Sequence, residues 1–336
     1  MSVTTVVLIG FAFALDLLVG EPPTAAHPVA WFGDLVGALD REWTGSATGQ
    51  RLIGVAIAVL APLLPAAVAA GAVLAATRVA PLAGAAVAGL VLFVTTSLRT
   101  LLELTDDVVA ATEGDLETAR EQVRGLVGRD ASTLSPAEIR SGAIESAAEN
   151  LSDGLVATLL PFAVLAPLSL PAAAAAAAWV KGVNTLDSML GYPSKPIGTA
   201  SARLDDLVMW LPARATALSI AVASGEPRAL SRARAEARRP ASPNSGWPMA
   251  TLAYVLSVRL RKPGAYDLNA DRHLPTLEDG HRAVTLVGFA AAVAVVVAVV
   301  LAAVGTLAFA ATGLETTALE TAGNTASIPV DREVML

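Results

Sequence analysis

The chain has 336 residues, of which 54% are hydrophobic and 16% are charged, and its net charge is −7. This composition is typical of an integral membrane protein and argues against a pair of soluble domains. The absence of cysteine excludes disulfides, thiolate metal sites and cysteine nucleophiles, and the acidic balance provides no basic field for nucleic acid.

Four apolar segments are long enough to cross a bilayer, and they lie near residues 3–20, 52–76, 80–98 and 283–311. The first has neither the positively charged start nor the cleavage site of a signal peptide, so we interpret it as a retained span. A Pro-rich loop and a short amphipathic piece with an apolar side follow it. His27 lies in this loop, where a histidine with satisfied hydrogen bonds is as reasonable an interpretation as a functional one.

Two further segments, 155–180 and 207–223, are doubtful spans. Three prolines interrupt the first, which either crosses as a kinked helix or enters and returns as two half-helices covered by protein. The second is short and contains Arg214, whose charge is costly in hydrocarbon. If neither segment crosses, all polar blocks of the chain face one compartment. We favour this arrangement because an active site cannot be divided by a bilayer.

The polar segments between the spans have their own signals. Residues 99–143 alternate charged and apolar side chains at helical spacing, which predicts soluble amphipathic helices. Ser135, Pro136 and Glu138 have the spacing of a capping box, so a helix is expected to begin there. Residues 226–282 contain ten Arg or Lys against six Asp or Glu, and the positive-inside rule places them in the cytoplasm.

These signals predict an all-α, polytopic integral membrane protein with amphipathic and cytoplasmic helical loops. Residues 1–315 are expected to form a single membrane-embedded domain, and residues 316–336 a polar, disordered tail. We therefore expect a multi-pass protein whose first partner is the lipid bilayer.

Chemistry-bearing residues concentrate between positions 144 and 214. Glu145, Glu149 and Asp153 share one face of a predicted helix, and three carboxylates on one face repel one another unless a cation joins them. A solvated helix face is the simpler interpretation of these acids. Lys181 and Asn184 share a face of a later helix, so the two helices together could hold a metal-bound phosphate.

Other residues in this part of the chain have equally open interpretations. Arg203 and Asp206 are spaced as an ordinary surface ion pair. The loop 238–248 contains three prolines and one glycine together with Ser242, Asn244 and Trp247. It is either a stiff ligand-gripping loop or a helix-capping turn.

The chain contains neither a P-loop nor a nucleophile elbow. Carboxylates, asparagines, one lysine, two arginines and rigid loops remain, and this set suits Mg²⁺ and phosphate better than acyl-enzyme chemistry.

The motifs resemble those of the CobD/CbiB family of cobalamin biosynthesis, in the same order over roughly residues 10–285. The amino-terminal signature is similar around Asp16, Gly20-Glu21-Pro22-Pro23 and His27-Pro28. The later motifs are Glu145-Ser-Ala-Ala-Glu149-Asn150, Lys181-Gly-Val-Asn184-Thr185-Leu186-Asp187-Ser188, Ala200-Ser201-Ala202-Arg203-Leu204-Asp205-Asp206, Pro212-Ala213-Arg214 and Ser242-Pro243-Asn244-Ser245-Gly246-Trp247-Pro248.

The resemblance implies an adenosylcobinamide-phosphate synthase in the cell membrane, with its active site facing the cytoplasm. Such an enzyme is an ATP-dependent ligase that joins adenosylcobyric acid to aminopropanol or its O-phosphate. ATP and Mg²⁺ are then the expected co-substrate and activating ion, and the corrinoid is a substrate rather than a cofactor. Other late cobalamin-pathway membrane enzymes are candidate partners, and nucleic acid is not.

On this interpretation the expected site has three parts. The metal ligands are Glu145, Glu149 and Asp153. The expected catalytic residues are Lys181, Asp187, Arg203 and Asp206. Substrate-binding residues are expected at His27, Asn150, Asn184, Arg214, Ser242, Asn244 and Trp247.

The chain departs from the family's pattern in three places. Pro240-Ala241 stands where the family usually has a His-Pro pair, Met249 replaces a usual glutamate, and the loop after Tyr192 is shorter. These departures could alter the preference for the amine. The alternative function is a membrane transporter or scaffold for corrinoid intermediates, although the chain shows no internal repeat of the kind that many transporters have.

Overall fold

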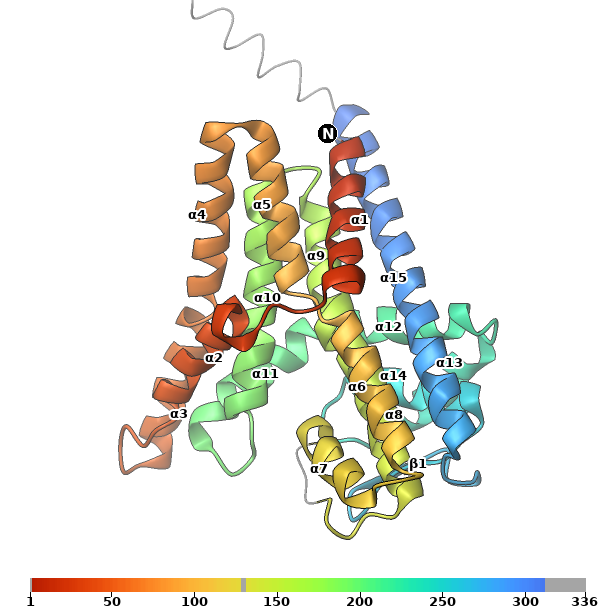
Figure 1. The fold of residues 1–336 in the computed structure, drawn as a ribbon. Helices are drawn as coiled ribbons and strands as arrows, with labels where there is room; N and C mark the ends of the chain where they lie inside the picture. Colours follow the sequence, from red (N-terminus) through yellow and green to blue (C-terminus); the bar gives the residue numbers. More distant parts are fainter. Residues whose placement is uncertain (1, 128–130, 312–336) are drawn as a thin grey trace, which may run out of the picture.

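The computed structural model describes residues 2–127 and 131–311, and within them it is almost entirely helical, as predicted (Figure 1). The predicted tail 316–336 lies outside the described residues. The α-helices are α1 (Ser2–Val19), α2 (Pro28–Leu39), α3 (Ala47–Leu60), α4 (Leu63–Val79), α5 (Pro81–Val94), α6 (Leu98–Ala111), α7 (Leu116–Val127), α8 (Pro136–Leu151), α9 (Ala157–Leu165), α10 (Leu170–Leu190), α11 (Thr199–Val208), α12 (Trp210–Ala223), α13 (Arg228–Glu236), α14 (Gly246–Leu256) and α15 (Leu277–Ala311).

Shorter elements connect these helices. They are the 3₁₀ turns η1 (Thr24–Ala26) and η3 (Pro196–Gly198), the π-helical turn η2 (Ser152–Val156) and the strands β1 (Leu260–Lys262) and β2 (Tyr266–Leu268). The two strands form an antiparallel hairpin in which Arg261 faces Asp267.

Four helical segments in the described part of the chain are long and apolar enough to cross a bilayer, namely Ala47–Val79, Pro81–Ala111, Pro136–Leu165 and Leu277–Phe309. The bent pair Pro196–Val208 and Trp210–Ala223, with 46° between its helices, would make a fifth. The predicted spans near 52–76, 80–98 and 283–311 overlap these segments over most of their length. The predicted first span corresponds to α1, but its apolar part Thr5–Val19 is a shorter apolar helix and is not among these candidate spans.

The doubtful segment 155–180 contains a reversal of the chain. Helix α9 ends before Pro167, and α10 starts again at Leu170 with the Ser169 side chain accepting a hydrogen bond from the amide of Ala172. A proline cannot donate to the helix ladder, so the turn forms here. Helix α10 packs against α9 and α4 and returns to the end from which α9 came (Figure 1).

The second doubtful segment is α12, which packs against α14, α15 and the turn η2. Helices α8, α11, α12 and α14 and the β-hairpin therefore gather in the lower half of the view in Figure 1. Whether 155–180 and 207–223 cross a bilayer stays a prediction.

Helix α8 organises this end because most of its residues are buried. It begins with the predicted capping box, in which the Ser135 side chain accepts from the amide of Glu138 and the Glu138 carboxylate accepts from that of Ser135. At its other end the turn η2 widens the helix, as π-turns often do at functional positions. A Cβ on Gly154 would lie 2.6 Å from Ser97 Oγ, so a larger residue there would displace the Ser97 side chain at the start of α6.

Candidate functional site

The three predicted metal ligands lie in different surroundings. Glu145 is 4% exposed, and its carboxylate accepts hydrogen bonds from Ser141 Oγ and from Tyr266 Oη, each at 2.8 Å. Ser141 Oγ in turn accepts from the amide of Arg261 at 2.7 Å. The Glu145 carboxylate therefore holds α8 to the β-hairpin, directly through Tyr266 and indirectly through Ser141 and Arg261. This is a structural role.

Glu149 and Asp153 lie one and two turns further along and are half-buried. The Glu149 carboxylate is within electrostatic range of Asp153, Glu145 and Lys262. Nowhere in residues 2–127 and 131–311 do three His, Asp or Glu side chains converge in a geometry that would hold a metal ion. Mg²⁺ is commonly bound by one or two carboxylates together with substrate phosphates, so Glu149 and Asp153 fit a cation that arrives with a nucleotide.

Helix α10 places its polar residues opposite η2. Asn184 Nδ2 donates to Asp153 Oδ2 at 3.4 Å, which links the two motif blocks across 31 positions of sequence. The Lys181 ammonium interacts electrostatically with Asp153 and Glu21. Ser188 instead donates to the Asn184 carbonyl at 2.9 Å and so serves its own helix.

Lys181 also faces a polar chamber of about 310 Å³ that is lined by His27, Glu21 and Thr96. His27 caps α2, because its Nδ1 accepts from the amide of Val29 at 3.2 Å. Burial lowers the pKa of this imidazole below its usual range, and Lys181 adds to the effect while Glu21 opposes it. The predicted substrate-binding histidine is thus a neutral helix cap at the wall of the chamber.

An apolar groove of about 370 Å³ adjoins the chamber and shares Lys181 and Val29 with it. Helices α2, α4, α5 and α10 form the groove.

Arg214 connects α12 with the loop 238–248. Its Nη1 donates to Asn244 Oδ1 at 2.6 Å, and its guanidinium lies over the rings of Trp210 and Trp247, 4.7 and 5.1 Å from their centroids. Planar cations stack favourably on indole faces. The predicted contact loop is therefore joined to the Pro212-Ala213-Arg214 motif.

Asp206 completes this group from α11. Its carbonyl oxygen accepts from Asn244 Nδ2 at 2.7 Å, and its carboxylate accepts from Ser242 Oγ at 3.4 Å. Arg203 lies 3.8 Å from the Asp206 carboxylate but is 82% exposed, so it forms the predicted surface pair. Asn150 is turned back to its own helix, where it donates to Ser146 Oγ at 2.8 Å.

Two residues near Asp153 were not predicted individually. Asp205 and Ser152 are 8% and 2% exposed, and within the described structure neither Asp205 Oδ1 nor Ser152 Oγ has a hydrogen-bond partner. Asp205 is within electrostatic range of Asp153, Asp187 and Asp206. Its position four residues after the buried Ser201 is a helical spacing that signals a buried face.

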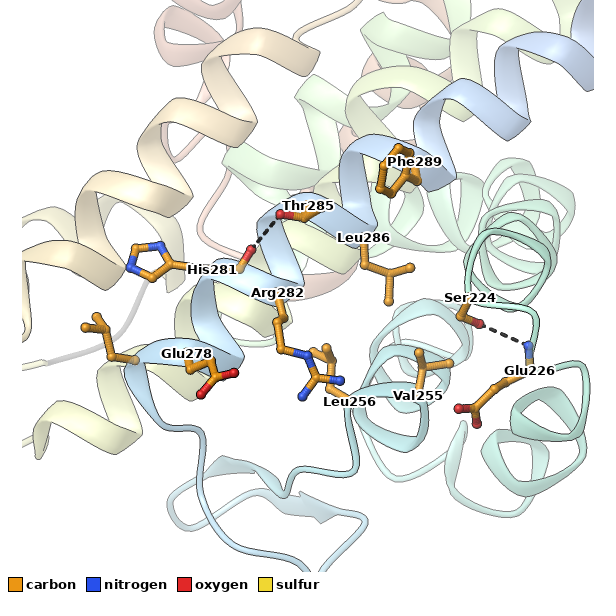
Figure 2. Close-up of a pocket in the computed structure, with 11 residues that line it drawn as sticks. Ser224, Glu226, Val255, Leu256, Glu278, His281, Arg282, Thr285, Leu286 and Phe289 are labelled. Carbon is orange, nitrogen blue, oxygen red and sulfur yellow. Dashed lines mark hydrogen bonds between the residues drawn. The ribbon is translucent and has the colours of Figure 1, made fainter.

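Most of the predicted site residues thus form three neighbouring groups: the chamber at Lys181, the acids around Asp153, and the Arg214 contacts. Another cavity lies apart from these groups. It has about 630 Å³ and lies between α14, α15 and the end of α12, with Arg282, Glu278 and Phe289 on its wall (Figure 2).

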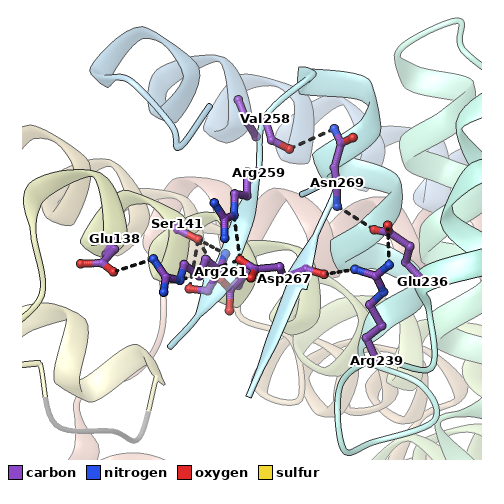
Figure 3. Close-up of polar contacts among 10 residues, drawn as sticks. Glu138, Ser141, Glu236, Arg239, Val258, Arg259, Arg261, Asp267 and Asn269 are labelled. Carbon is purple, nitrogen blue, oxygen red and sulfur yellow. Dashed lines mark hydrogen bonds and ion pairs between the residues drawn. The ribbon is translucent and has the colours of Figure 1, made fainter. Parts of the chain in front are cut away.

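A network of hydrogen bonds and ion pairs joins α8, α13 and the β-hairpin (Figure 3). Asp267 accepts from Arg259 at 2.7 Å through its carboxylate and from Arg239 at 2.6 Å through its carbonyl. The hydrogen bond from Arg259 lowers the pKa of the Asp267 carboxyl below its usual range. Glu236 accepts from the amide of Asn269 at 2.6 Å, so α13 and the loop that follows it are held to the hairpin.

The fold and the site together define an α-helical, multi-pass membrane protein with carboxylates, amides and cations gathered at one end. Residues 9–296 match the family model described as CobD/Cbib protein, and the chain belongs to the CobD/CbiB family.

Curated relatives agree with this assignment. The chain is 39% identical to cobalamin biosynthesis protein CobD of Geobacter metallireducens, over 76% of this chain and 81% of that one. It is 38% identical to CobD of Rhodobacter capsulatus, over 78% and 82% of the two chains, and 35% identical to cobalamin biosynthesis protein CbiB of Salmonella paratyphi B, over 76% and 82%. No solved structure matches the chain.

Proposed function

We propose that this protein is an adenosylcobinamide-phosphate synthase, which uses ATP to join adenosylcobyric acid to aminopropanol or its O-phosphate. One observation carries the proposal: Asp153 of η2 and Asn184 of α10 are hydrogen-bonded, and this contact joins the acids of one motif to the Lys181 motif. A carboxylate pair beside a lysine suits the transfer of a phosphoryl group.

Amide formation from a carboxylate requires a leaving group. In the proposed reaction a corrinoid carboxylate oxygen attacks the γ-phosphorus of ATP, ADP departs, and an acyl phosphate results. The amine nitrogen then attacks the acyl carbon, inorganic phosphate leaves, and the nitrogen gives up its proton. The products are one amide, ADP and phosphate.

The residues divide this work by charge. Glu149 and Asp153 would hold Mg²⁺, which when bound neutralises charge on the nucleotide phosphates. Lys181 lies beside Asp153 and adds a positive charge for the transferring group. Arg214 and Asn244 face one another and would orient the other end of a substrate. Asp187 and Asp206 supply further carboxylates next to these groups.

The proposed setting is the cell membrane, with the polar end of the bundle in the cytoplasm. Residues 226–282 carry ten Arg or Lys against six Asp or Glu. They include α13, α14 and the hairpin, which lie at the same end of the bundle as α8 and α11 (Figure 1).

An assay on membranes that contain the protein tests the proposal. Adenosylcobyric acid, ATP, Mg²⁺ and either aminopropanol or its phosphate are supplied, and the corrinoid product is identified by mass. Amide product with one ADP for each amide is the expected result. Corrinoid binding without product, with both amines, would instead favour a transporter or scaffold for corrinoid intermediates.

A further inference from the structure

Asp205 is a buried carboxylate with incomplete hydrogen bonding. It lies on the inner face of α11, is 8% exposed, and its Oδ1 atom has no hydrogen-bond partner among residues 2–127 and 131–311. The hydrogen bond of Asp205 with Asn184 replaces only part of the hydration that the carboxylate loses on burial. An ordered water, an ion or a bound ligand can supply the missing partner of such an atom.

The charges around Asp205 indicate whether a ligand there is a cation or an anion. The charges that act on it most strongly are those of Asp153 and Asp187, and Asp206 adds to them. Lys181 pairs its charge with Glu21 and Asp153, and Arg203 is exposed and lies beside Asp206. Asp205 and Asp187 are therefore an acidic pair whose charged forms a bound cation would stabilise.

A divalent metal held at Asp205 by the protein alone would need several oxygen ligands at one short distance, and no three acids or histidines converge in that way in the described structure. At Glu149 and Asp153, in contrast, the nucleotide phosphates would supply the remaining ligands. A primary ammonium is less demanding, because its three N–H donors turn freely to acceptors at hydrogen-bond distance. Asn184, whose carboxamide interacts with both Asp153 and Asp205, adds an amide oxygen or nitrogen to the wall.

We infer that Asp205 and Asp187 form the binding site for the ammonium group of a small primary amine substrate, and that Asn184 positions Asp205. The inference rests on the proposed function, which requires an amine as the second substrate. Asp153 neighbours both Lys181, which would meet the phosphates, and Asp205, which would meet the amine.

A binding experiment tests the site without the reaction. The full-length protein in detergent is titrated calorimetrically with aminopropanol O-phosphate and with propanol phosphate, which lacks the amine, in the absence of ATP and corrinoid. Asp205→Asn should weaken binding of the amine about tenfold or more and leave binding of propanol phosphate within about twofold. Asp107→Asn, which removes an exposed carboxylate of α6, is the matched control and should change neither.

Three results would overturn the inference. They are an unchanged affinity of Asp205→Asn for the amine, an equal loss for both ligands in a folded variant, and a loss of Mg²⁺ binding in a titration with Mg²⁺ alone while amine binding persists. If Asp205→Asn does not fold, Asp187→Asn carries the same expectation.

The two proposals can fail separately. Amine-selective binding that depends on Asp205, without amide product in the membrane assay, would leave the ammonium site standing and refute the synthase. Amide formation with an unchanged KM for the amine in Asp205→Asn would support the synthase and refute the ammonium site.

Discussion

Two polar regions lie at the same end of the helical bundle. They differ in whether their buried polar atoms have hydrogen-bond partners. In the network of α8, α13 and the β-hairpin, Glu145, Asp267 and Glu236 each accept hydrogen bonds from named donors. Around η2 and α11, Asp205 Oδ1 and Ser152 Oγ are buried without partners in the described structure. The same residue types therefore serve as braces in one region and remain available to a ligand in the other.

The difference between the two regions is clearest in α8, because Glu145 and Glu149 are one turn apart and yet belong to different regions. The bonds of Glu145 to Ser141 and Tyr266 occupy both of its oxygens. Glu149 instead faces Asp153 and Lys262. Spacing on a helix thus predicted a shared face correctly but did not distinguish a brace from a ligand.

The largest effect is expected for Glu149→Gln. The variant keeps the shape of the side chain but loses the charge that would hold Mg²⁺, so amide formation should fall by about 100-fold or more. The membrane assay measures this directly. Glu121→Gln, on the exposed side of α7, is the matched control and should retain full activity. Wild-type turnover in Glu149→Gln would show that Glu149, like Glu145, has a structural role and does not hold Mg²⁺.

Arg214→Lys should have a smaller but clear effect. Lysine keeps the charge but cannot both stack between Trp210 and Trp247 and donate to Asn244 in the same geometry. We expect about a tenfold loss in kcat/KM, with amounts of protein in the membrane unchanged. A variant that is fully active would show that Arg214 only packs the loop 238–248.

Tyr266→Phe tests the bracing region itself. It removes the donor to Glu145 and should lower the free energy of unfolding by about 1 kcal/mol while changing kcat/KM little. Thermal unfolding in detergent, followed together with turnover, measures both quantities. If activity fell strongly without a loss of stability, Glu145 would belong with the site after all.

The smallest effect is expected for Asp267→Asn, and it should depend on pH. Because Arg259 lowers the pKa of Asp267 in the folded chain, this carboxylate stabilises the fold above its unfolded pKa of 3.8, and the contribution is lost as pH falls through the lower folded value. The pair is partly exposed, so the variant should lose no more than about 1 kcal/mol at pH 7. Unfolding of both proteins at pH 7 and below pH 3.8 should show the difference shrinking in acid.

Several parts of the fold could be predicted because they depend on local chemistry. Residues Ser135 and Glu138 form the capping box that their spacing indicated, since both hydrogen bonds lie within one turn. The apolar segments near 52–76, 80–98 and 283–311 lie in long helices, since length and hydropathy alone decide that property. The reversal between α9 and α10 was one of two open alternatives, because a proline can kink a helix or end it.

The sequence by itself determined the helical membrane class, the family and the identities of the polar motifs, because these follow from composition, periodicity and the order of residues. Only the tertiary structure decided which acids have hydrogen-bond partners at both oxygens and which have an oxygen without a partner in the described structure. Tyr266 reaches Glu145 from 121 residues away, and Asp205 meets Asp153 only after α9 and α10 have reversed the chain. Partners at such separations are chosen by packing, and no local pattern records them.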